Sequence, residues 1–228
     1  MVPAISPSTK ALGFWSAVLA TVFSIAYDVG QIAEWSGWLG SHGGPESSST
    51  PLGFVVLLTP SLLLGSSFLV LVVCLHDLAT PDRRVWSRAA IAFATAYAVL
   101  ISLNYYVLLT FVTPRLMAGR VAGIEPFLFT PFDSFLYSVD ILGYSFMSVA
   151  TLLAARVFTG DGLEQRARLL LTANGLLLPF LALQIYFHWL IWVAALWAVT
   201  FPGSTWTIAL IFRRARTFPA STVVVGVA

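Results

Sequence analysis

The sequence predicts an all-α, polytopic membrane protein: a bundle of six transmembrane helices with both termini on the inner side. Composition is the first observation, because 58% of the 228 residues are hydrophobic, 10% are charged, and the mean hydropathy is +0.88. A soluble domain carries about 25% charged residues. So little polar surface cannot solvate a globular protein in water, and the lipid bilayer must be the partner of most of the chain.

Six apolar stretches form the second observation, since a bilayer core needs roughly 20 apolar residues per helix. They predict spans at Leu12–Glu34, Pro51–Leu75, Arg88–Val112, Ser134–Phe158, Leu169–His188 and Ile191–Phe212. We expect them to form one bundle domain over residues 1–228, with the fifth turn between Phe187 and Ala194. The first stretch is too long for a signal peptide and contains Asp28, so we expect it to be retained as a span.

The distribution of basic residues is the third observation. With the N-terminus inside, the inner segments hold ten of the twelve Lys and Arg residues, and the outer segments hold only Arg115 and Arg120. Inner loops of membrane proteins are enriched in Lys and Arg, so this division predicts that both termini are inside. It also supports an even number of spans.

Two outer connections differ in character. Residues 41–50 (SHGGPESSST) are small and polar. Residues Thr113–Phe132 are apolar and contain three prolines, which predicts an interfacial or partly re-entrant segment lying over the bundle. Proline inside three of the apolar stretches predicts helix kinks, at Pro60, Pro179 and Pro202.

Three polar side chains are predicted at one depth in the membrane. Asp28 lies about seven residues before the outer end of the first span, Asn104 about eight before that of the third, and Asp140 about six inside the fourth. At roughly 1.5 Å per residue, each sits on the order of 10 Å below the outer surface. We therefore expect these three residues to face a common pocket.

Neighbouring polar residues extend this pattern. Gln31 shares a helix face with Asp28, and the spacing of Asp133, Tyr137, Asp140 and Tyr144 makes a continuous polar stripe. In the fifth span, Gln184 and His188 are four residues apart. The candidate ligand-binding pocket therefore comprises Asp28, Gln31, Asn104, Tyr137, Asp140, Tyr144, Gln184 and His188.

The charges of this pocket need partners, because a carboxylate inside a membrane is costly. Arg115 and Arg120 are the candidate lid charges, since they are the only basic residues on the outer side. Without them, burial favours the protonated form of one or both aspartates, because it disfavours the charged form of a carboxyl group. A purely structural role, in which these side chains only join helices, is the alternative interpretation.

The sequence lacks the signatures of several membrane chemistries. It has no CxxC, no HExxH and no Walker motif, and its three histidines are dispersed. The single lysine, Lys10, precedes the first span, which excludes a retinal Schiff base. We therefore expect no cofactor and no metal ion, and the scattered arginines give no sign of a nucleic-acid partner.

Two segments resemble those of small uncharacterised bacterial integral membrane proteins with about six helices: PFDSFLYSVDILGYSFMS and LLTANGLLLPFLALQIYFH. The resemblance implies a multi-pass protein of the plasma membrane in a bacterium or archaeon. It implies no activity and no ligand.

Three functions remain open at this point. The first is binding or transport of a small solute or lipid headgroup in an outward-opening polar pocket. The second is a membrane-embedded enzyme in which Asp28, Asp140 and His188 perform acid–base chemistry on a lipid-soluble substrate. The third is a structural or accessory subunit. The sequence does not predict an oligomeric state.

Overall fold

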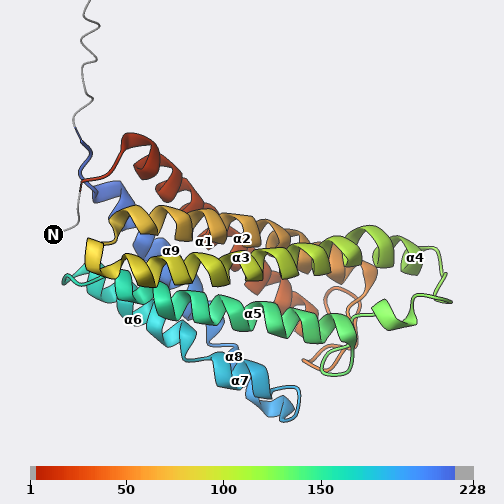
Figure 1. Cartoon of the computed structure of the whole chain (residues 1–228). Helices are drawn as coiled ribbons and strands as arrows, with labels where there is room; N and C mark the ends of the chain where they lie inside the picture. Colours follow the sequence, from red (N-terminus) through yellow and green to blue (C-terminus); the bar gives the residue numbers. More distant parts are fainter. Residues whose placement is uncertain (1–3, 219–228) are drawn as a thin grey trace, which may run out of the picture.

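The computed structural model describes residues 4–218 and shows a bundle of long helices (Figure 1). Within these residues, six helical segments are long and apolar enough to cross a membrane, which confirms the predicted helical membrane bundle. Their bounds are Pro7–Trp35, Pro51–Leu78, Pro81–Met117, Phe135–Val157, Leu163–Leu183 and His188–Arg214. Each of them overlaps one predicted span.

Three of the six segments are single long helices, and one of these ends in a 3-10 turn. These are α1 (Pro7–Trp35), α2 (Pro51–Leu78) and α5 (Phe135–Ala154, followed by a 3-10 turn at Ala155–Val157). Local sequence explains where they begin. The side chains of Ser6, Thr50 and Ser134 each accept a hydrogen bond from the backbone N–H three residues later, at 3.0–3.2 Å. Such N-caps satisfy backbone donors that a helix start leaves unpaired.

The other three segments are interrupted. The third runs from a 3-10 turn (Pro81–Arg83) through α3 (Arg84–Val107) and a π-helical turn (Leu108–Val112) into α4 (Thr113–Met117). The fifth is divided into α6 (Leu163–Gly175) and α7 (Leu178–Leu183). The sixth comprises a 3-10 turn (His188–Leu190), α8 (Ile191–Ala194) and α9 (Trp197–Arg214).

The helices form a closed ring in chain order. Each of α1, α2, α3, α5, α6 and α9 packs against the next, and α9 packs back against α1. Both ends of the described chain meet at one end of the ring, where the Ile5 N–H donates to the Arg216 carbonyl at 3.0 Å. We call the opposite end of the bundle the distal end; it carries the connections 36–50, 118–134 and 184–187 (Figure 1).

Aromatic rings fill the middle of the ring of helices. Phe68 of α2 contacts Tyr97 of α3 and Phe201 of α9, with ring centroids 5.8 and 5.5 Å apart. Tyr97 also lies 5.6 Å from Tyr144 of α5. Phe68, Tyr97 and Phe201 are at most 2% exposed, so the centre of the bundle is closed.

Two connections differ from their predicted bounds. The turn between the fifth and sixth spans lies at residues 184–187, mostly before the predicted window of Phe187–Ala194. The predicted interfacial segment begins later than Thr113, because helix continues to Met117. Its aromatic side chains pack on the distal end of the bundle: Phe127 contacts Phe111, and Phe129 contacts Phe54 and Tyr137.

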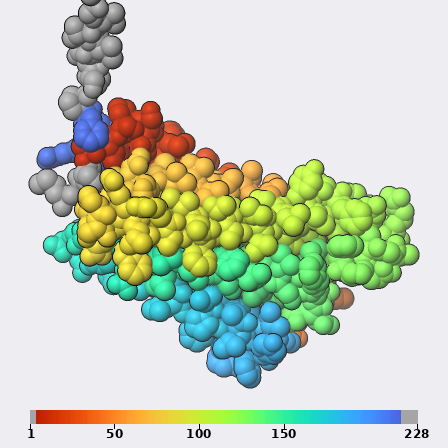
Figure 2. All heavy atoms as spheres, viewed as in Figure 1, coloured from red at the N-terminus to blue at the C-terminus, as the bar shows by residue number. Residues whose placement is uncertain are grey.

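The α7–α8 segment diverges from the bundle axis at the distal end (Figures 1 and 2). It is bounded by two helix breaks, at residues 176–177 and 195–196. Pro179 follows the first break directly, so the proline predicted to kink this span lies beside an interruption. Pro60 and Pro202 lie inside α2 and α9.

Candidate functional site

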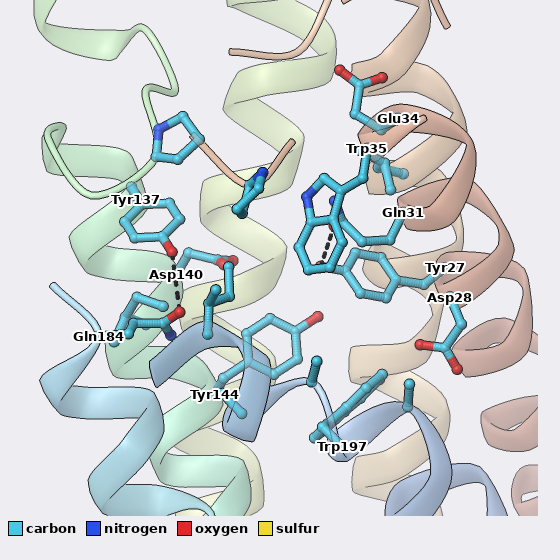
Figure 3. A pocket seen from close by; sticks show the side chains of 18 of the residues that line it. Tyr27, Asp28, Gln31, Glu34, Trp35, Tyr137, Asp140, Tyr144, Gln184 and Trp197 are labelled. Atoms are coloured by element: carbon cyan, nitrogen blue, oxygen red, sulfur yellow. Dashed lines mark hydrogen bonds between the residues drawn. The ribbon is translucent and has the colours of Figure 1, made fainter. Parts of the chain in front are cut away.

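A cavity of about 300 Å³ lies at the distal end of the bundle, above the aromatic centre (Figure 3). Its walls come from the distal parts of α1, α2, α3 and α5 and from the interrupted fifth and sixth segments. The distal connections contribute Ser47, Ser49, Phe129 and Pro131. The volume is at the lower end of the range for small-molecule sites.

One wall is built by a single face of α5. Tyr137, Asp140 and Tyr144 follow each other at spacings of three and four residues, so all three point to the same side of the helix. All three line the cavity, as the polar stripe in the sequence predicted. In Figure 3 they face side chains that project from α1.

Asp140 is held by a tyrosine from the neighbouring helix. The Tyr105 hydroxyl of α3 donates to Asp140 Oδ1 at 2.6 Å, and the Tyr144 hydroxyl lies 3.3 Å from the Tyr105 hydroxyl. Asp140 is only 8% exposed. The three side chains therefore form one polar cluster at the cavity wall.

The opposite wall comes from the last turns of α1. Asp28 and Gln31 line the cavity as predicted, and the Tyr27 hydroxyl donates to Gln31 Oε1 at 3.0 Å. Glu34 lines it as well and is 2% exposed, and neither of its carboxyl oxygens has a hydrogen-bond partner in the described part of the chain. This carboxyl group lies against the first turn of α2, where only a glycine, Gly53, leaves room for it.

The diverging segment completes the cavity. Gln184, which follows α7, donates from Nε2 to the Leu181 carbonyl at 2.9 Å and accepts a 3.5 Å hydrogen bond from the Tyr137 hydroxyl. Trp197, at the start of α9, lines the cavity between two tyrosines. Its ring centroid lies 5.9 Å from that of Tyr27 and 5.8 Å from that of Tyr144.

The cavity wall carries acidic side chains and no basic ones. Asp28, Glu34 and Asp140 line it, whereas no Lys, Arg or His of the described residues does. Within the described part of the chain, the ion pairs are Arg83–Asp82 and His188–Glu46, so neither Asp28 nor Asp140 has a basic partner. The site is therefore suited to a ligand that brings a positive charge or several hydrogen-bond donors.

The arginines predicted as lid charges lie elsewhere. Arg115 donates from Nη1 to the Phe111 carbonyl at 3.1 Å, and its guanidinium lies 3.7 Å from the centroid of the Phe111 ring. Arg120 is exposed. Neither lines the cavity. The reason is geometric: the helical extension to Met117 carries both residues beyond the distal ends of the other helices (Figure 1).

Two of the eight predicted pocket residues do not reach the cavity. Asn104 is 1% exposed and donates from Nδ2 to the Leu136 carbonyl at 3.0 Å, on the α3–α5 contact. Successive residues of a helix point about 100° apart, and here it is Tyr105 that faces the cavity. His188 is exposed at the distal surface, where it pairs with Glu46 at 3.1 Å and stacks on Phe132.

Several residues that line the cavity escaped the sequence analysis, among them Tyr27, Glu34, Trp35, Tyr105 and Trp197. Tyr27 precedes Asp28 and Tyr105 follows Asn104 in the sequence. This adjacency to predicted pocket residues could have indicated that the two tyrosines lie near the cavity. Glu34 lies three residues after Gln31, so the two side chains are on the same face of α1. Trp197 is the start of a helix whose beginning the hydropathy did not mark.

Comparison with protein-family models, with curated proteins and with solved structures finds no match to this chain. Within residues 4–218, no cluster of three or more His, Cys, Asp and Glu side chains is arranged to hold a metal ion. Fold and site together define a class: a multi-pass helical membrane protein with an acidic, aromatic cavity at one end.

Proposed function

We propose that the protein is a plasma-membrane protein that binds a small organic cation in the distal cavity, which faces the outside of the cell. The observation that carries the proposal is the composition of the cavity wall, which has three carboxyl side chains, several aromatic rings and, among residues 4–218, no basic side chain. Carboxyl groups, whose ionised form a nearby cation favours, and aromatic ring faces are the two features of this wall that attract a cation.

The outward direction rests on the division of basic residues. Ten of the twelve belong to segments at the end of the bundle that holds the termini, and two belong to the distal end. If the positive-inside rule holds for this chain, the cavity faces outward. A free solute and the headgroup of a lipid in the outer leaflet are both compatible with this placement.

Binding is favoured over transport by the floor of the cavity. Phe68, Tyr97 and Phe201 are at most 2% exposed, and two of them contact lining residues: Tyr97 contacts Tyr144, and Phe201 stacks on Trp197. A transporter needs a second conformation with a path past these rings. The simplest function for the observed conformation is therefore that of a receptor or binding protein.

One observation favours a second candidate, a membrane-embedded enzyme. Tyr105 and Asp140 form a buried donor–carboxyl pair beside the cavity, and such a pair can exchange a proton with a bound substrate. In this alternative Asp140 is the acid–base group. His188 takes no part, because it lies outside the cavity.

The test compares wild-type protein with Asp140→Asn, purified in a maltoside detergent and challenged with a panel of small ammonium compounds and matched anions. Thermal unfolding should shift upward with cations for the wild type, since a ligand that binds only the folded state stabilises it. The shift should be much smaller for Asp140→Asn. The control is Asp133→Asn, the same change at an exposed residue that does not line the cavity.

Equal shifts in all three proteins, or a preference for anions, would contradict the proposal. Mass spectrometry of molecules that co-purify with wild type but not with Asp140→Asn tests it independently. The enzyme alternative predicts instead that cells carrying Asp140→Asn accumulate a lipid-soluble compound that wild-type protein converts in vitro.

A further inference from the structure

We infer that the cation recognised in the distal cavity is an alkylated ammonium ion, tertiary or quaternary, that carries no anionic group. This inference rests on the proposed function and names its ligand class. Three properties of the cavity wall support it: the pairing of its polar groups, the arrangement of its aromatic rings, and the absence of basic side chains among the described residues that line it.

The tyrosines of the wall are paired with other polar side chains of the wall. The Tyr27 hydroxyl donates to Gln31, the Tyr105 hydroxyl to Asp140, and the Tyr137 hydroxyl to Gln184. A primary ammonium has three N–H donors and needs an acceptor for each of them. Apart from carboxyl oxygens, these paired side chains offer few free acceptors to such a group, whereas a methylated ammonium has few or no donors to satisfy.

The carboxyl groups of Asp28 and Glu34 have no hydrogen-bond partner within residues 4–218, but they do not converge on the centre of the cavity. In Figure 3 the Glu34 carboxyl group lies nearer the distal end than the space between Tyr27 and Tyr144, and the Asp28 carboxyl group lies on the side of Tyr27 that faces away from Tyr144. The Glu34 oxygens are, in addition, buried against the first turn of α2. These groups therefore contribute negative potential at a distance and do not form a ring of direct acceptors.

Aromatic side chains surround the centre instead. Tyr27 and Trp35 project from α1, Tyr137 and Tyr144 from α5, and Trp197 begins α9 (Figure 3). The ring faces attract a cation through their quadrupole, and aromatic cages are the usual site for quaternary ammonium groups. Alkylation also lowers the cost of removing the cation from water, because the charge is shielded from strong hydrogen bonding.

The charge of the wall excludes a second class of ligands. A phosphate or carboxylate on the ligand would lie in a small cavity with Asp28, Glu34 and Asp140 and without a basic residue among the described lining. Unpaired like charges in a confined site are strongly unfavourable. A free alkylammonium ion should therefore bind, and a zwitterion with the same ammonium group should not.

The experiment uses a matched series of probes: ethanolamine, N,N-dimethylethanolamine, choline and phosphocholine. Binding to full-length protein in a maltoside detergent at pH 7.5 is measured by isothermal titration calorimetry. We expect affinity to rise with each methylation, on the order of tenfold from ethanolamine to choline. Phosphocholine should bind at least about tenfold more weakly than choline.

Two variants of one residue separate the ring from its hydroxyl. Tyr27→Phe keeps the ring and removes the bond to Gln31, and it should retain the preference for choline over ethanolamine. Tyr27→Leu removes the ring and should lose most of that preference. If Tyr27→Leu does not fold, as judged by size-exclusion chromatography, the probe series on the wild type still decides the question.

The outcomes distinguish a wrong ligand class from a wrong assignment of the cation site. Ethanolamine binding as tightly as choline, or phosphocholine binding as tightly as choline, overturns the inference and leaves the proposed cation site intact. The same holds if Tyr27→Leu folds and keeps the full preference. If no amine in the series binds wild type more tightly than Asp140→Asn, the proposed function itself fails.

Discussion

The buried carboxyl group of Asp140 has its hydrogen-bond donor in Tyr105. The carboxyl group is 8% exposed, its bond to the tyrosine hydroxyl is 2.6 Å long, and it has no basic partner among the described residues. A polar group buried in an apolar bundle is costly when its partner is removed. The pair therefore links α3 to α5 at the point where the cavity begins.

This dependence gives a stability prediction. Tyr105→Phe should lower the free energy of unfolding by on the order of 1–2 kcal/mol, because Asp140 loses its donor while the ring remains. The adjacent residue provides the control: Tyr106 is 62% exposed, and its hydroxyl makes no hydrogen bond in the described structure. Tyr106→Phe should be nearly neutral. Denaturant titration in mixed detergent micelles measures both, and equal losses would show that the bond is unimportant.

Glu34 presents the opposite case, a buried carboxyl group with no partner. The N-terminus of α2 favours negative charge beside it by up to about 2 kcal/mol, which is less than the several kcal/mol that burial of an unpaired ion costs. We predict that Glu34→Gln raises the free energy of unfolding by on the order of 1 kcal/mol. Glu125→Gln, at an exposed site, should not change it. A destabilised Glu34→Gln protein would mean that the carboxylate has a compensating contact.

At the scale of elements, glycines set how closely helices approach. Gly175 ends α6 where it meets α5, and a Cβ there would lie 2.6 Å from Leu152 Cβ and 2.8 Å from the Ser148 carbonyl oxygen. Beside it, Asn174 joins three helices: it donates to Thr151 of α5 at 3.2 Å and accepts from Thr200 of α9 at 3.0 Å. The close approach therefore also positions a buried hydrogen-bonded triad.

Two Gly→Ala changes test this approach. Gly175→Ala should destabilise the bundle by about 1–3 kcal/mol, because backbone atoms of α5 must move. Gly203→Ala, inside α9, meets only the end of the Leu170 side chain at 3.4 Å and should be neutral or slightly stabilising, since alanine favours helix. Unfolding in SDS compares the two variants. Similar effects at both positions would contradict the packing explanation.

Interruptions of the fifth and sixth segments are the second element-scale feature. Leu177, Ala194 and Ala195 lie at the two breaks, and all three line the cavity. Irregular backbone inside a membrane protein is tolerated where it is packed in protein or borders a cavity. The breaks therefore occur where the fold can accommodate them, and they direct α7 and α8 away from the axis to make room for the site.

At the scale of the whole molecule, the ring of helices gives the protein two different ends. The end that holds the termini carries ten basic residues, and the distal end carries the cavity and only Arg115 and Arg120. This division of charge is the basis of the proposal that the cavity faces outward.

Cysteine labelling in intact cells tests that orientation. In a Cys74→Ala background, Ser48→Cys in the first distal connection should react with an impermeant thiol reagent, because Ser48 is exposed and predicted to be outside. Asp82→Cys is also exposed, at the other end, and should react only after permeabilisation. The reverse pattern would place the cavity on the inner side and would exclude an extracellular ligand.

The sequence by itself determined the number and approximate position of the membrane segments. Hydropathy measures burial in lipid, which depends on composition and length and needs no knowledge of tertiary contacts. Spacing within one helix is equally local, so the shared face of Tyr137, Asp140 and Tyr144 was predictable, as was that of Asp28 and Gln31.

Only the tertiary structure decided which residues meet across helices. Depth along the membrane does not specify the direction in which a side chain points, and one residue, about 100° of rotation, separates Asn104 on a helix contact from Tyr105 in the cavity. Arg115 and Arg120 lie outside the cavity because the third segment continues as helix to Met117. His188 lies outside it because α7 ends at Leu183, before this residue. The direction in which a side chain points around its helix axis is fixed by how that helix packs against its neighbours. Residue spacing within one helix does not specify this packing.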